Sequence, residues 1–320
     1  FISAGAGSGK TFRLTEILHE QLSSGAVRPS GVIATTFTKK AAAELRERVR
    51  SHLLSTGSYA LANAMGQARI GTVNSVCGGL LKRFAFEAGL ATEQQVLEEG
   101  QASVLVKQAI DAVIDGPNVA DLLEIVNRLG IEDWQKELND LLDKARANDI
   151  APALLPAFAA ENAREFLQYW PKTTKQDLSK ELLKAIAFAV PTLTAATTSA
   201  KPVKKTIDYL TLVRNVERGV TAGNARWSEW VKLSKELPEK GLIPVAEPIR
   251  DLAARFSEHC VLQTDVAQYL ERIFSLCAEA MKVYDLRKRE MGVVDFVDQE
   301  HLLLKVLDEE SVAATLKEEL

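Results

Sequence analysis

A glycine-rich loop with a lysine and a threonine begins the chain: residues 4–11 read Ala-Gly-Ala-Gly-Ser-Gly-Lys-Thr. Glycines let successive backbone N–H groups close around a polyphosphate, a following helix presents its positive end, the lysine reaches the terminal phosphates, and the threonine hydroxyl can ligate Mg²⁺. The loop alone predicts anion binding. We therefore expect a nucleotide to be bound by Ala4, Gly5, Ala6, Gly7, Ser8, Gly9, Lys10 and Thr11.

A second set of chemistry-bearing residues lies within 34–49, where an apolar run ends and a helix-forming run begins. The set offers the Phe37 ring, the hydroxyls of Thr36 and Thr38, and the Lys39 ammonium. A ring that stacks on a base, next to donors for phosphate, suits single-stranded nucleic acid. Core packing of Phe37 beside solvated lysines is an equally good interpretation on spacing alone.

Thr72, Asn74 and Ser75 form a third set after another short apolar run. Short polar side chains at such a junction could cap a helix or contact a phosphate, and without further context capping is favoured.

The elements that must position these residues alternate between helix and strand. Apolar periodicity predicts helices over 10–24, 39–54 and 74–89, and strands over 31–37 and 69–72. The 31–37 run is β-branched and apolar, which is typical of a buried strand in a parallel sheet, and Thr38 is expected to cap the next helix. Because ligands bind at the carboxyl edge of such sheets, the second and third sets are expected there.

From about residue 91 the strands are expected to end. Prolines, Pro191 among them, interrupt the helical patterns too often for a coiled coil, and the polar run 192–205 predicts a mobile surface loop. A glycine and a Val-Val-Asp-Phe stretch within 291–307 then predict a return to the first domain. The helices are expected over 93–115, 119–129, 132–148, 156–169 and 179–189, and the domains over 1–89, 90–290 and 291–320.

The composition of the chain limits the classes of function that it can have. The 320 residues, 47% hydrophobic and 26% charged, predict two soluble domains, and no apolar run approaches the roughly 18 residues that span a bilayer, so no membrane partner is expected. A net charge of −4 gives no general attraction to nucleic acid, so such binding requires local patches. Cys77, Cys260 and Cys277 contain no CxxC pair, which favours reduced thiols and a cytoplasmic location.

Together these segments resemble the superfamily 1 DNA helicases of the UvrD/Rep type, and the length of the helical region resembles the RecB/AddA-like members. AGAGSGKT is similar to the family's first motif, TTFTKKAAAELRERV to its single-strand-contacting motif, GTVNSVCGGLLKRF to the third, and VVDFVDQEHLLLKVL to the segment before the Walker B strand. The resemblance implies an α/β fold: a partial P-loop NTPase (RecA-like) motor domain with a parallel sheet and a large all-helical inserted subdomain.

The resemblance also implies an activity. The parent would be an ATP-dependent helicase that translocates 3′ to 5′ on single-stranded DNA in recombination or repair, acts on single strands or duplex ends, and works with a nuclease domain or a partner subunit. ATP and Mg²⁺ are the implied cofactors, with Lys10 and Thr11 catalytic and Thr11 on the metal. Phe37, Thr38, Thr72 and Asn74 would lie along DNA, although Asn74 stands where the family commonly has His.

The chain is expected to be an N-terminal fragment that ends before Walker B. Asp295 is followed by Phe296 instead of a second acid, and the acidic run 308–310 follows a Leu-rich helix instead of a strand. Hydrolysis needs an acidic pair for Mg²⁺ and arginines for the transition state. This fragment is therefore expected to bind nucleotide weakly and not to hydrolyse it.

Two other functions remain open. One is a P-loop small-molecule kinase that uses the helical region as a lid. The other is a non-catalytic DNA-binding module with phosphate contacts at Lys201, Lys204 and Lys205 or at the run 287–289, for which solvated charge is the default interpretation.

Overall fold

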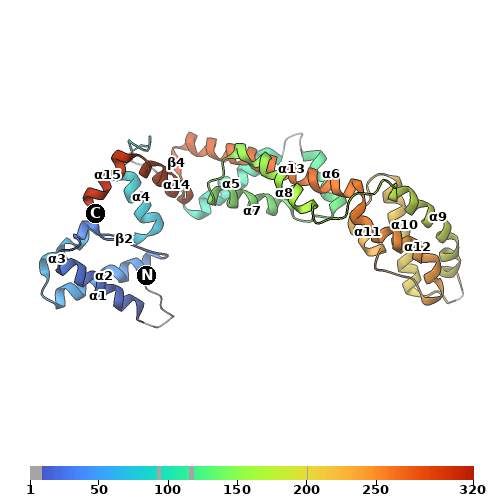
Figure 1. Cartoon of the computed structure of the whole chain (residues 1–320), viewed down its shortest axis with the longest axis horizontal. Coiled ribbons are helices and arrows are strands. Elements are labelled where there is room, and N and C mark those ends of the chain that lie inside the picture. The colour runs from blue at the N-terminus through green and yellow to red at the C-terminus, as the bar shows by residue number, and fades with distance from the viewer. Residues whose placement is uncertain (1–8, 92–94, 115–118, 200) are drawn as a thin grey trace. The chain divides into compact units, whose positions relative to one another are not determined.

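The computed structural model describes residues 9–91, 95–114, 119–199 and 201–320, and the chain divides into two compact units (Figure 1). The first unit comprises Phe1–Ser103 and Arg287–Leu320, and the second comprises Val104–Leu286. The division at 89 and 290 that the sequence suggests stays a prediction.

The first unit opens with alternating helices and short parallel strands. Strands β1 and β2 pair in parallel, with Ile33 opposite Arg69 and Thr36 opposite Thr72. A parallel pair needs a crossover connection, which α2 and α3 supply. The elements are α1 Lys10–Ser23, β1 Ile33–Thr36, α2 Lys39–Ser55, α3 Tyr59–Ala64, β2 Arg69–Thr72 and α4 Val73–Arg83, with short 3₁₀ turns at Pro29–Gly31 and Met65–Gln67.

Helix α2 buries one stripe against this small sheet. Ala42, Leu45, Val49 and Leu53 follow one another at three- and four-residue spacing and are all buried, which is the pattern of an amphipathic helix. The expectation of a buried strand at 31–37 is wrong, since Ile33 is 42% exposed. Among the described residues, β1 has only β2 as a hydrogen-bonded neighbour, so its other edge has no strand beside it.

The chain returns to the first unit after the helical region. Strand β4 Val293–Val294 pairs in parallel with β3 Gln95–Val96, so the expectation that strands end at about residue 91 is wrong. Two residues are too few for a periodic signal, and this pairing joins segments about 200 positions apart. Helices α14 Phe296–Leu307 and α15 Glu310–Glu319 follow. They pack on α4 through Leu80, Phe84, Leu303, Val306, Val312 and Leu316.

The regular elements in the described part of the second unit are all helical. The unit contains a largely buried bidentate ion pair: Arg128 donates to both carboxylate oxygens of Asp265, at 3.0 and 2.6 Å, and the Trp227 Nε1–H donates to the same carboxylate at 2.8 Å. The helices are α5 Glu99–Ile114, α6 Val119–Leu129, α7 Trp134–Ala147, α8 Leu155–Leu167, α9 Leu178–Thr197, α10 Lys204–Thr221, α11 Trp227–Leu233, α12 Ile243–Ala254 and α13 Cys260–Met291, with 3₁₀ turns at Pro152–Leu154, Lys240–Leu242 and Phe256–Glu258.

Helix α9 contradicts the predicted loop at 192–205. The helix continues through Pro191 to Thr197, and α10 already begins at Lys204. Proline removes one helical N–H bond. Ala189 and Leu193, on either side of it, are fully buried in the core of this unit, and their packing keeps the helix intact. Across the part of the chain that is described, we find no helix with the length and apolar content to cross a membrane.

Candidate nucleic-acid interface

The described part of the phosphate-binding loop begins at Gly9; Ala4, Gly5, Ala6, Gly7 and Ser8 lie outside the described residues. Gly9 has φ +77° and precedes α1 in the left-handed conformation, which glycine adopts at little cost. Gly9 at the N-cap has no side chain to cap the first turn, whose N–H groups have the arrangement that an anion requires at a helix start. Thr11 lies exposed in that turn. These residues fit a bound phosphate and a metal ligand.

The carboxyl ends of β1 and β2 coincide. Thr36 and Thr72 are the last residues of their strands and stand opposite each other in the parallel register. The next residues, Phe37 and Val73, therefore leave the sheet at the same edge, and each strand leads into a helix, α2 or α4. The second and third predicted sets of residues are thereby brought together.

Phe37 is 99% exposed at this edge. The core-packing interpretation of its ring is therefore wrong. The reason is local: Phe37 lies between the last residue of β1 and Thr38, the cap of α2, where no element of the described part of the chain covers it. Lys39 follows as the first residue of α2 and is also exposed. An uncovered ring beside a cation is the arrangement that base stacking and phosphate contact require.

The hydroxyls at the edge organise the two helix starts. Thr38 Oγ1 accepts from the Ala41 N–H at 3.1 Å, and Thr72 Oγ1 accepts from the Ser75 N–H at 3.2 Å, so the capping interpretation of Thr72 is confirmed. Thr36 Oγ1 donates to the Thr38 carbonyl at 3.0 Å.

An accepting hydroxyl keeps its own O–H, so Thr38 and Thr72 can still donate to a phosphate. Asn74 is half-buried in the first turn of α4 and has no side-chain hydrogen bond to another described residue. Its amide therefore has both donor and acceptor capacity left at the edge.

Arg46 is a neighbour of the edge that the sequence analysis missed. Its guanidinium donates to the Ile70 carbonyl, and it lines a hollow of about 380 Å³ together with Ser75 and Gly79 of α4. Arg46 follows Lys39 by seven residues, or about two helical turns, and that spacing on one helix face was the available signal. Its remaining N–H groups make it a further cation beside the edge.

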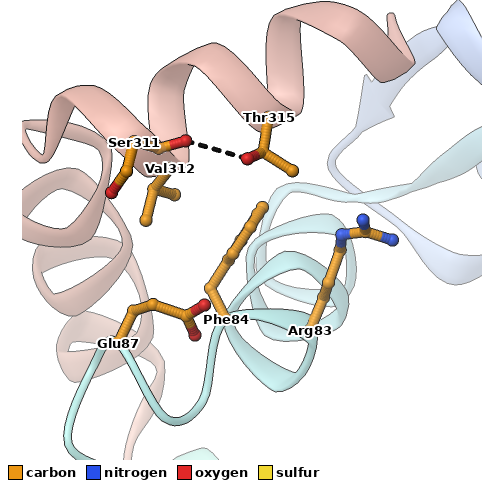
Figure 2. A pocket seen from close by; sticks show the side chains of 6 residues that line it. All are labelled: Arg83, Phe84, Glu87, Ser311, Val312 and Thr315. Atoms are coloured by element: carbon orange, nitrogen blue, oxygen red, sulfur yellow. Dashed lines mark hydrogen bonds between the residues drawn. The ribbon is translucent and has the colours of Figure 1, made fainter.

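A second hollow, of about 430 Å³, lies between α4 and α15 (Figure 2). The Phe84 ring rises between the two helices, and Arg83 points to one side of it. Arg83 also pairs with the Glu319 carboxylate, which Arg69 Nη2 approaches at 3.0 Å. This hollow adjoins the last turn of α4, whereas Thr72 and Asn74 lie at its first turn, so it is separate from the edge. Its lining is Arg83, Phe84, Glu87, Ser311, Val312 and Thr315.

The acidic residues near the chain's end have structural roles. Asp295 caps α14 by accepting from the Asp298 N–H at 3.0 Å, and Asp298 accepts from the Asp295 N–H at 3.0 Å. Lys288 is 4% exposed and lies 3.6 Å from Asp295. The interpretation of the run 287–289 as solvated charge is therefore wrong at Lys288. Because Lys288 is buried, it is also excluded as a phosphate contact. Glu309 stands at the N-cap position of α15 and is exposed.

Comparison with known proteins gives a match over the whole chain: the model of the UvrD/REP helicase N-terminal domain matches residues 1–320. An ATP-dependent helicase/nuclease subunit of Desulforudis audaxviator is 26% identical over 356 residues, covering 96% of this chain and 29% of the relative. The corresponding protein of Pelotomaculum thermopropionicum is 27% identical over 362 residues, covering 96% and 28%. The ATP-dependent DNA helicase SRS2 of Saccharomyces cerevisiae is 32% identical over 114 residues, covering 36% and 9%. The chain spans less than a third of each relative's length.

Proposed function

Because the chain belongs to the UvrD/REP helicase N-terminal domain family, we propose that it is the N-terminal part of an ATP-dependent helicase that translocates 3′ to 5′ on single-stranded DNA in recombination or repair. The family implies a P-loop NTPase fold. Residues 1–89 and 291–320 belong, in this proposal, to a partial RecA-like motor domain, and 90–290 form a helical insertion. The sequence match, the parallel β1–β2 pair and the return of the chain after α13 support this assignment.

The exposed Phe37 ring is the observation that carries the proposal. Its position at an edge shared by two parallel strands suits stacking on an unpaired base. In the proposed mode, the strand's phosphates meet hydroxyl, amide and ammonium groups on either side of the ring. The proposed DNA contacts are Thr36, Phe37, Thr38, Lys39, Thr72 and Asn74.

Binding of single-stranded DNA by the whole 320-residue chain tests this proposal. Replacing one stacking ring costs about 1–3 kcal/mol, so Phe37→Ala should weaken binding of a dye-labelled oligo(dT) about 5- to 150-fold in fluorescence anisotropy. Phe86→Ala is the matched control, because Phe86 is 81% exposed in the same unit but lies beyond the far end of α4. Equal affinities for the two variants would contradict the DNA contact.

The nucleotide site is proposed at residues 4–11, with the backbone and Lys10 on the phosphates of ATP and Thr11 on Mg²⁺. Bound Mg²⁺ would supply charge neutralisation for phosphoryl transfer. We propose weak binding without turnover by these 320 residues. The absence of turnover is supported by Asp295, because its carboxylate caps α14 and lies 3.6 Å from the Lys288 ammonium. A fluorescent ATP analogue should bind weakly and Lys10→Ala should abolish that binding, whereas DNA-stimulated hydrolysis by the chain would contradict the absence of turnover.

The names of two relatives extend the proposal to the parent protein. Both are helicase/nuclease subunits by name, so a nuclease domain or a partner subunit is proposed for the parent. The proposal also includes duplex DNA ends as a further substrate and the cytoplasm as the parent's location. A longer version of the chain should then degrade linear duplex DNA in the presence of ATP.

A further inference from the structure

The end of α8, in the second unit, carries an exposed aromatic pair. Phe166 is 51% exposed and Tyr169 is 84% exposed. The helical geometry continues past Leu167, because the Gln168 N–H donates to the Arg164 carbonyl at 3.0 Å and the Trp170 N–H donates to Leu167 at 3.0 Å. Residues three apart in such geometry are surface neighbours, so the two rings share one face.

A third ring packs against Phe166. Trp170 is half-buried against the core of the second unit, and its ring centroid lies 5.6 Å from that of Phe166. The segment that follows is also held in place, since the Thr174 N–H donates to the Glu258 carbonyl at 3.0 Å and Gln263 Nε2 donates to Pro171 at 2.9 Å. The Phe166 ring and the segment after Trp170 are therefore held in place, which lowers the entropy cost of ordering them when a ligand binds.

Two lysines follow the aromatic rings in the sequence. Lys172 and Lys175 are exposed, and neither makes an ion pair with another described residue. The Cα atoms of Tyr169 and Lys172 are separated by three links of 3.8 Å, so they lie at most about 11 Å apart. The Lys172 ammonium is thus within reach of a ligand stacked on Tyr169, and Lys175 lies three residues farther along the chain.

Two of the four nearby carboxylates are paired with arginines. Glu161 pairs with Arg164 at 3.1 Å, Glu258 pairs with Arg255 at 2.7 Å, and Asp177 caps α9 by accepting from the Lys180 N–H at 3.0 Å. Glu165 remains as an exposed carboxylate on the last turn of α8. Asp177 keeps its negative charge, because its cap is a hydrogen bond from a neutral N–H. Lys172 and Lys175 have no ion-pair partner among the described residues, and such cations beside exposed rings suit a polyanion with flat rings.

We propose that Phe166, Tyr169, Lys172 and Lys175 form a second contact for single-stranded nucleic acid, on the helical unit and separate from the β1–β2 edge. The rings stack on successive bases and the lysines meet the phosphates between them. Such a contact tolerates any base sequence, because every base has a face to stack. The inference rests on the proposed function only in taking single-stranded DNA as the polyanion.

Photo-cross-linking and anisotropy with the whole chain test this inference. An iodouracil-substituted oligonucleotide should cross-link to the peptide that contains Phe166 and Tyr169. The double variant Phe166→Ala/Tyr169→Ala should lose that cross-link and bind oligo(dT) at least about 5-fold more weakly, as stacking energies require. Phe188→Ala is the matched control, since Phe188 is 78% exposed on α9 beside Lys184, whose ammonium pairs with Glu181 at 2.8 Å.

A second measurement does not depend on removing the rings. Lys172→Gln/Lys175→Gln should reduce the slope of log affinity against log salt by about 1.4, because each single-strand phosphate contact contributes about 0.7. An unchanged slope, or cross-links confined to residues outside 166–175, would overturn the inference.

The two proposed DNA sites can fail separately. If only Phe37→Ala weakens DNA binding, the site at the β1–β2 edge is supported and the α8 site is excluded. If only the α8 variants weaken DNA binding, the α8 site is supported and the edge site is excluded. If the α8 variants keep DNA affinity but lose a protein partner, the surface is a protein-docking site and the inference is wrong.

Discussion

The Nζ atom of Lys288 lies 2.6 Å from Oδ1 and 2.7 Å from Oδ2 of Asp298. This contact joins the last turns of α13 to the first turn of α14, beside the β3–β4 pair. A buried ammonium is tolerated only when carboxylates compensate its lost hydration, and Asp298 and Asp295 do so here. Helix α14 in turn packs on α4, whose first turn contains Asn74.

Lys288→Met should destabilise the first unit by about 3 kcal/mol, because two carboxylates lose their cation. The measurement is hydrogen exchange of α14 amides by mass spectrometry. Arg289→Met is the control: Arg289 is exposed on the next position, and its change should stay within about 0.5 kcal/mol. Equal protection of α14 in both variants would show that the ion pair contributes little.

Asp265→Asn should destabilise the second unit by about 3 kcal/mol. The change removes the charge that the Arg128 guanidinium binds through two hydrogen bonds, and Asp265 is 1% exposed. Trp134, Trp170, Trp227 and Trp230 are the four tryptophans and all lie in this unit, so urea unfolding followed by tryptophan fluorescence reports on it alone. Asp121→Asn should have almost no effect, since its pair with Arg272 is exposed.

The second unit should lose stability as the pH falls below about 6.5. Burial lowers the pKa of His259, and Asp177 and Asp265 offset this shift only in part. The Val261 N–H donates to His259 Nδ1 at 3.2 Å, so protonation of that nitrogen would break the bond. Above the unfolded pKa both states are neutral, whereas below it the unfolded state binds the proton more readily.

The check is tryptophan-detected urea unfolding between about pH 5 and pH 8. His259→Gln should flatten the profile, and His52→Gln, in the first unit, should leave it unchanged. A wild-type stability that is constant over this range would disprove the role of His259.

Gly78→Ala and Gly79→Ala should have opposite effects on the first unit. A Cβ at Gly78 would lie 2.8 Å from Nε2 of the buried Gln299, so crowding between α4 and α14 should cost about 1–3 kcal/mol. A Cβ at Gly79 meets nothing within 4 Å, so alanine should stabilise this helical position by about 0.5–1 kcal/mol. Circular dichroism melts compare the two, and stabilisation by both would show that Gln299 simply moves aside.

The sequence alone was enough to predict the elements that depend on neighbouring residues. The cap at Thr38, strand Arg69–Thr72 and helix Val119–Leu129 match their predictions because capping and amphipathic periodicity are local. It also indicated which residues gather at the carboxyl edge, since parallel strands that lead into helices bring their ends together.

Which of these side chains are exposed to solvent depends on packing between distant segments, which the sequence patterns do not show. Phe37 is uncovered and Lys288 is enclosed, although their types and spacing allowed either outcome. Strand Gln95–Val96 and the continuation of α9 through Pro191 likewise depend on partners distant in the chain. Burial and pairing arise from what packs against a residue, and that information is spread over segments up to about 290 positions apart.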